Sequence, residues 1–152
     1  MEKIIVLIAD DDKDDQSFAE KAIQENYIDK DIDIDIHSVT DGESLLRFLR
    51  KEDEFKESPR PSIVFLDLKM PKMGGIESLI EIREDEELRD IPIIVLTTSR
   101  SREDIEESYQ SGANSYITKP GFYDDLKEIM YRTGRFWFES AKLPRGSKWK
   151  KK

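Results

Sequence analysis

The chain has 152 residues, no cysteine, a single histidine and a net charge of −9. This is the length of one domain, and the composition excludes disulfide frameworks, thiolate metal sites and catalytic sets that need several histidines. No apolar run approaches the roughly 18 residues that cross a bilayer, and the N-terminus lacks a signal-peptide pattern. We therefore expect a cytoplasmic protein with no membrane contact.

Short apolar runs alternate with amphipathic stretches in the first half of the chain. Residues 4–8 form a β-branched run that ends at three aspartates, and apolar side chains recur at helical spacing over residues 13–26. Residues 32–36 alternate isoleucine with aspartate, which predicts a strand with one polar face at the edge of a sheet. A helix is expected from about residue 42, and residues 63–66 form a third strand, which ends at Asp67.

The second half continues the same alternation. A loop over 70–75 leads into a helix over about 75–84, and a strand over 91–96 is followed by Thr97. Ser101 is expected to cap a helix that ends at Gly112, and a short strand at 116–117 precedes Lys119. The last helix is expected over about 122–141, with its buried face formed by Leu126, Ile129, Met130, Thr133 and Trp137.

Five strands that alternate with five helices predict an α/β fold with a parallel sheet covered on both faces. The first, third and fourth strands are apolar throughout, as expected of strands buried on both faces. One domain is expected over residues 1–141. Residues 142–152 hold six basic residues and no acidic one, which predicts a solvated, poorly ordered basic tail. The acidic body argues against nucleic acid as a ligand.

Polar side chains follow four of the five predicted strands. They are Asp10, Asp11 and Asp12 after the first strand, Asp67 after the third, Thr97 after the fourth and Lys119 after the fifth. Ligands of open α/β sheets bind outside the carboxyl ends of the strands. Clustered carboxylates favour Mg²⁺, which takes carboxylates, water and phosphate oxygens, and a lysine adds positive charge for phosphoryl transfer. Asp67 is the best placed nucleophile.

Each of these residues also has an ordinary structural interpretation. Asp12 has the position of a helix N-cap, Thr97 that of a turn residue, and Lys119 that of a surface lysine. The conjunction favours a functional site, because every one of these residues stands at the end of the appropriate strand.

Four segments of the chain resemble the signature blocks of response-regulator receiver domains. They are residues 6–12, 64–71, 95–98 and 116–120, and the resemblance extends over about residues 3–140. It implies a flavodoxin-like (βα)5 three-layer sandwich with strand order 2-1-3-4-5. It also implies a phosphoacceptor signalling protein that catalyses only its own phosphorylation and dephosphorylation and has no DNA-binding output domain.

The resemblance implies a role for each residue of the predicted site. Asp67 is the phosphoryl acceptor, Asp10 and Asp11 bind Mg²⁺ (or Mn²⁺) together with Asp67 and the Lys69 backbone carbonyl, Thr97 moves to the phosphoryl group, Lys119 pairs with it, and Tyr116 turns inward. Lys69 stands at a position that tunes the lifetime of the acyl phosphate, and we expect a long-lived phosphoryl group. Gly74 stands where many members of the family have aspartate.

The resemblance also implies partners. A sensor histidine kinase donates the phosphoryl group from a phosphohistidine, and the downstream protein target is unknown. Residues 135–144 resemble the ending of stand-alone receivers that serve phytochrome-like sensor kinases. The fourth helix, fifth strand and fifth helix form the expected output surface and a candidate homodimer interface, while the aromatic side chains of the last helix either contribute to a dimer or pack under the first strand.

Two alternatives remain open. A haloacid-dehalogenase-type phosphatase also uses an aspartate after an apolar strand, but it needs a second aspartate where this chain has Lys69. A phosphorylation-independent binding module would keep the receiver fold without using its chemistry.

Overall fold

The five strands form one parallel sheet in the order β2-β1-β3-β4-β5, as predicted. The computed structural model describes residues 3–145. The strands are β1 (Lys3–Ala9), β2 (Asp33–Val39), β3 (Ile63–Leu66), β4 (Ile93–Thr97) and β5 (Ser115–Thr118). As expected, β2 lies at an edge and the apolar strands β1, β3 and β4 lie inside the sheet.

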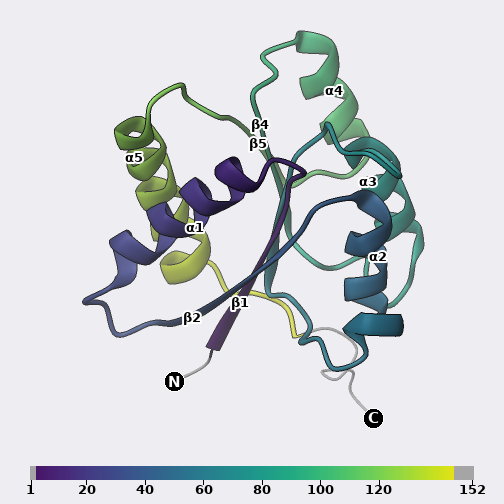
Figure 1. Cartoon of the computed structure of the whole chain (residues 1–152), viewed down its shortest axis with the longest axis horizontal. Helices are drawn as coiled ribbons and strands as arrows, with labels where there is room; N and C mark the ends of the chain where they lie inside the picture. The colour runs from purple at the N-terminus through teal and green to yellow at the C-terminus, as the bar shows by residue number, and fades with distance from the viewer. Residues whose placement is uncertain (1–2, 146–152) are drawn as a thin grey trace.

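Helices cover both faces of the sheet. They are α1 (Lys13–Tyr27), α2 (Gly42–Arg50), α3 (Gly75–Glu84), α4 (Arg102–Gln110) and α5 (Tyr123–Gly134), with a 3₁₀ turn η1 (Asp53–Phe55) and a π-helical turn η2 (Arg135–Ser140). Helices α1 and α5 lie on one face, and α2, α3 and α4 lie on the other (Figure 1). Within residues 3–145, no helix combines the length and apolar character needed to cross a membrane.

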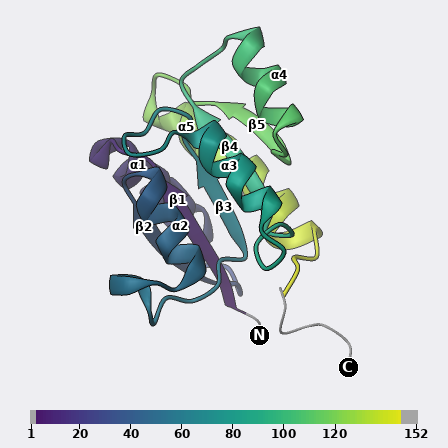
Figure 2. The same cartoon turned by 90° about the vertical axis from the view of Figure 1, so that its right-hand side faces the viewer.

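The core lies in two layers, one on each face of the sheet. Side chains alternate between the faces along a strand, so Leu7 packs toward α2 and α3 while Val6 and Ile8 pack toward α1 and α5. The register sets Ala9 of β1 opposite Leu66 of β3. Because all strands are parallel, their carboxyl ends meet at one edge, which can be followed in the turned view of Figure 2.

Capping residues set the helix boundaries that the sequence predicted. The Asp12 side chain accepts hydrogen bonds from the backbone N–H groups of Asp14 and Asp15 at the start of α1. Ser101 Oγ accepts from the Asp104 N–H at 3.2 Å at the start of α4. Gly112, just beyond α4, has a φ of 112°, a left-handed conformation that glycine adopts without steric cost.

The end of the last helix differs from the prediction. Helix α5 stops at Gly134 and continues as the wider turn η2, where the Ala141 N–H donates to the Phe136 carbonyl. A π-helical turn holds more residues than an α-helical one, and here Phe138 is buried while Trp137 is partly buried against the same core cluster.

Two residues of α1 and α5 explain where this turn packs. Tyr27 Oη donates to Glu139 Oε2 at 2.8 Å, and a Cβ at Gly134 would lie 2.5 Å from that hydroxyl oxygen. Phe138 joins the core beside β1, which confirms for this residue the expectation that the aromatic side chains pack under the first strand. Phe136, in contrast, is exposed. Of the predicted basic tail over 142–152, residues 146–152 lie outside the described residues.

Candidate functional site

Three carboxylates gather at the carboxyl edge of the sheet. Asp10 directly follows β1 and Asp67 directly follows β3, and each is less than a tenth exposed. One carboxylate oxygen from each of Asp10, Asp11 and Asp67 lies within 4.8 Å of the other two. The structure therefore brings together the acidic residues that the sequence predicted as metal ligands.

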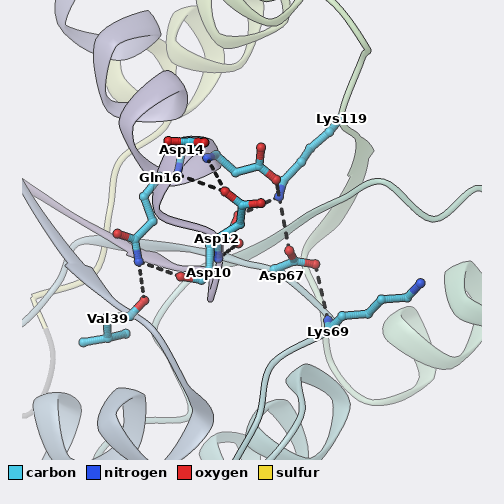
Figure 3. Close-up of polar contacts among 9 residues, drawn as sticks. Asp10, Asp12, Asp14, Gln16, Val39, Asp67, Lys69 and Lys119 are labelled. Carbon is cyan, nitrogen blue, oxygen red and sulfur yellow. Dashed lines mark hydrogen bonds and ion pairs between the residues drawn. The ribbon is translucent and has the colours of Figure 1, made fainter.

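Hydrogen bonds fix the loop that carries Asp10. The Asp12 N–H donates to Asp10 Oδ1 at 3.0 Å, and the Gln16 side chain donates to the carbonyls of Asp10 at 2.6 Å and Val39 at 2.9 Å. Figure 3 shows Gln16 reaching back from α1 to these carbonyls. The first turn of α1 thus holds the β1–α1 loop against the end of β2.

Asp67 is held from three sides. Its backbone N–H donates to the Ala9 carbonyl at 2.9 Å, the Lys69 N–H donates to Oδ1 at 3.3 Å, and Lys119 Nζ donates to Oδ2 at 3.1 Å. The Lys69 side chain points away from Asp67 (Figure 3). The predicted role of the Lys69 carbonyl as a metal ligand stays a prediction.

Lys119 brings the end of β5 to the carboxylates. Its side chain is 10% exposed, and Nζ lies 2.6 Å from Asp10, 2.9 Å from Asp15 and 3.1 Å from Asp67. Burial alone would lower the pKa of Lys119, but the hydrogen bonds with Asp10 and Asp15 and the negative charges of Asp67 and Asp10 together outweigh it, so the pKa is raised and the ammonium stays charged.

The carboxylates exceed the positive charge available to them. Burial raises the pKa of Asp10 to about 6, against the hydrogen bond from Lys119, which lowers it. Closely spaced buried carboxylates favour either a proton or a cation. A hard divalent ion that prefers oxygen ligands fits this donor set.

The predicted switch residues lie at the neighbouring strand ends. Thr97, the last residue of β4, is fully buried, and its Oγ1 is the buried side-chain polar atom without a hydrogen-bond partner among residues 3–145. Buried hydroxyls without partners are uncommon in folded proteins. Tyr116 Oη donates to the Ser99 carbonyl at 2.9 Å, which ties β5 to the β4–α4 loop.

Sequence reasoning missed two residues of this site, Asp15 and Gln16. Both stand in the first turn of α1, and Asp15 stands three residues after the N-cap Asp12, a spacing that ordinarily marks a helix start. The contacts of the Asp15 and Gln16 side chains depend on how α1 packs against β2 and β5. Only the excess of acidic residues between positions 10 and 15 hinted at a further role.

The chain matches known proteins over most of its length. Residues 6–131 match the response regulator receiver domain. Response regulator Rcp1 of Synechocystis is 34% identical over 140 residues, which are 92% of this chain and 92% of Rcp1.

Solved structures agree with this match. The crystal structure of the Mn²⁺-bound form of Rcp1 has a TM-score of 0.83 at 34% identity and covers 93% of this chain and 99% of Rcp1. The phosphorylated cyanobacterial phytochrome response regulator RcpA has a TM-score of 0.87 at 33% identity and covers 94% and 99%. The chain therefore belongs to the response regulator receiver family of two-component signalling proteins.

Proposed function

We propose that Asp67 accepts a phosphoryl group from a phosphohistidine of a sensor histidine kinase. The observation that carries this proposal is the placement of Asp67, buried at the end of β3 between the Lys69 N–H, the Lys119 ammonium and the carboxylates of Asp10 and Asp11. This arrangement supplies an oxygen nucleophile, a cation for the incoming phosphoryl oxygens and a ligand set for a metal ion.

The phosphoryl transfer needs no general base from this chain. A carboxylate oxygen of Asp67 forms a bond to phosphorus as the bond from phosphorus to the donor's imidazole nitrogen breaks, and the imidazole keeps the electron pair. Later attack of water on phosphorus releases inorganic phosphate and restores the Asp67 carboxylate. Catalysis by the chain is thus confined to its own phosphorylation and dephosphorylation.

Mg²⁺ or Mn²⁺ would be held by the carboxylates of Asp10, Asp11 and Asp67, with the Lys69 carbonyl as a further ligand. When bound, such an ion neutralises charge on the transferring phosphoryl oxygens. The close approach of three carboxylates, of which Asp10 and Asp67 are buried, supports this assignment, as does the similarity to Mn²⁺-bound Rcp1.

The response to phosphorylation would pass through Thr97 and Tyr116. The unpartnered Thr97 hydroxyl can donate to a phosphoryl oxygen, and movement of Thr97 would displace the β4–α4 loop. Tyr116 would then give up the Ser99 carbonyl and turn inward. Such ordering of loops by phosphate contacts is a common form of switching.

The receiver unit is proposed to occupy residues 1–141 and to present α4, β5 and α5 to its protein partners or to a second copy. Tyr109 on α4 is 48% exposed, which supports an interaction surface there. Similarity to the phytochrome response regulator RcpA supports a phytochrome-like kinase as the donor.

Intact-mass spectrometry after incubation with acetyl phosphate tests the assignment of Asp67. We expect one added phosphoryl group that requires Mg²⁺ in the wild type, and none in Asp67→Asn, because an amide lacks the nucleophilic oxygen. Asp85→Asn changes an aspartate 18 positions after Asp67, outside the group of three carboxylates. It serves as the control and should be phosphorylated normally.

An equal adduct in Asp67→Asn would place the acceptor elsewhere. Absence of an adduct in the wild type, with both acetyl phosphate and a phosphorylated histidine kinase as donors, would favour the phosphorylation-independent binding module.

A further inference from the structure

The Lys119 ammonium has no N–H group to spare. A lysine ammonium carries three N–H donors, and here three carboxylate oxygens lie within hydrogen-bond distance, from Asp10 at 2.6 Å, Asp15 at 2.9 Å and Asp67 at 3.1 Å. The Lys119 side chain is 10% exposed, so water has little access to it. Lys119 can therefore contact a phosphoryl oxygen only if one of these three contacts is released.

Asp15 differs from the other two carboxylates that share Lys119. Asp10 and Asp67 follow strands and belong to the group of three carboxylates that can hold a metal ion, whereas Asp15 stands on α1 and lies outside that group. When a divalent cation occupies Asp10, Asp11 and Asp67, Asp15 is the partner of Lys119 that keeps its uncompensated charge.

The backbone holds Asp15 in this position. Its N–H donates to the N-cap Asp12 at 3.1 Å, which fixes the first turn of α1 beside the end of β5. Asp15 is 37% exposed, so its ion pair with Lys119 is worth less than a fully buried pair. A contact of this strength can be replaced by a contact between Lys119 and a phosphoryl oxygen, but its loss makes that replacement less favourable.

We propose that Asp15 is a positioning residue that competes with the phosphoryl group for Lys119 and thereby restrains phosphorylation of Asp67. Two effects act in the same direction. Asp15 occupies one of the three Lys119 donors, and its negative charge disfavours an anionic group nearby. This inference rests on the proposed function, because it assigns Asp15 a role in the reaction at Asp67.

The chain offers a matched control in Asp14. Asp14→Asn removes the same charge one residue earlier in the same helical turn, where the side chain is exposed, while Asp15→Asn also removes one of the ion pairs of Lys119. A change in affinity caused by net charge or by the helix dipole should appear in both variants.

The first measurement is the affinity of each variant for beryllofluoride, a phosphoryl analogue, at saturating Mg²⁺, followed by NMR. We expect Asp15→Asn to bind beryllofluoride about two- to fivefold more tightly than Asp14→Asn, as the loss of one partly exposed ion pair predicts. The rate of phosphorylation by acetyl phosphate should rise by a similar factor.

The second measurement is Mg²⁺ affinity without any phosphoryl analogue. Once the Asp15 charge is removed, Lys119 pairs more strongly with Asp10 and Asp67, so Mg²⁺ should bind about two- to fivefold more weakly to Asp15→Asn than to Asp14→Asn. A misfolded variant would lose both affinities, whereas the proposal requires changes of opposite sign.

Equal affinities of Asp15→Asn and Asp14→Asn in both titrations, or weaker binding of beryllofluoride by Asp15→Asn, would overturn the role of Asp15. If the wild type binds neither beryllofluoride nor a phosphoryl group, the proposed function fails instead. The Mg²⁺ titration then decides alone whether Asp15 shares Lys119 with the metal ligands.

Discussion

At the scale of single residues, Lys69 is placed by its backbone and not by its side chain. Its N–H donates to Asp67 Oδ1 at 3.3 Å, while its exposed side chain points away from Asp67 (Figure 3). A lysine side chain is long and flexible, so it can fold back over a phosphoryl group on Asp67. It would there add positive charge and limit the approach of water.

We expect Lys69→Asn to shorten the lifetime of the phosphoryl group. Loss of an exposed charge interaction of up to about 1 kcal/mol corresponds to hydrolysis about two- to fivefold faster, which release of inorganic phosphate from purified phosphoprotein would measure. Lys72→Asn is the control, because it removes the same charge from the same loop and asparagine tolerates the φ of 52° at that position. Identical rates for Lys69→Asn and the wild type would contradict the shielding role.

At the scale of elements, the start of α2 supports the β3–α3 loop beside Asp67. Lys72 and Met73 in this loop have φ values of 52° and 99°, conformations that non-glycine residues seldom adopt. The Glu43 N–H donates to the Lys72 carbonyl at 3.1 Å. The loop can approach this closely because Gly42 has no side chain, and a Cβ there would overlap the Met73 carbonyl oxygen.

Gly42→Ala should therefore separate α2 from this loop. We expect the free energy of unfolding to fall by about 1–3 kcal/mol, the usual range for an overpacked site, as measured by urea denaturation. Gly121→Ala adds the same methyl group where no atom lies within 4 Å, and its stability should be unchanged or slightly higher. Equal stabilities of Gly42→Ala and Gly121→Ala would show that the loop moves aside freely.

The elements that the sequence predicted well are those whose signals are local. Apolar strand runs, the N-cap Asp12 and the glycine after α4 all depend on neighbouring residues, and the strand ends that carry Asp10 and Asp67 follow from them. The π-helical turn η2 depends instead on Tyr27, whose hydroxyl meets Glu139 112 positions later. The contact of Asp15 with Lys119 spans 104 positions, so no local pattern could reveal it.

At the scale of the whole molecule, the site is a source of instability until its charge is balanced. The chain carries a net charge of −9, and burial raises the pKa of Asp10 from 3.8 to about 6. A carboxyl group with a raised pKa binds its proton more tightly in the folded than in the unfolded chain. Asp10 therefore lowers the free energy of unfolding as the pH rises from 3.8 to about 6, and the loss is complete above that pH.

Replacing Asp10 should thus have opposite effects with and without metal. In EDTA at about pH 8, we expect Asp10→Asn to exceed the wild type in free energy of unfolding by about 1–3 kcal/mol, and this excess should vanish as the pH falls toward 4. In excess Mg²⁺ this difference in free energy of unfolding should narrow or change sign. The reason is that an ion at 100 times its Kd stabilises the wild type by about 2.7 kcal/mol, while Asp10→Asn has lost a ligand.

Urea denaturation of both proteins across this pH range, with Asp14→Asn as the control for loss of an exposed charge, measures these differences. Asp14→Asn should respond to Mg²⁺ like the wild type, because the Asp14 carboxylate stands outside the group of three that can hold the ion. A wild type more stable than Asp10→Asn in EDTA at about pH 8 would mean that Lys119 fully compensates the buried carboxylates. The metal would then be needed for the chemistry of Asp67 and not for the balance of charge in the fold.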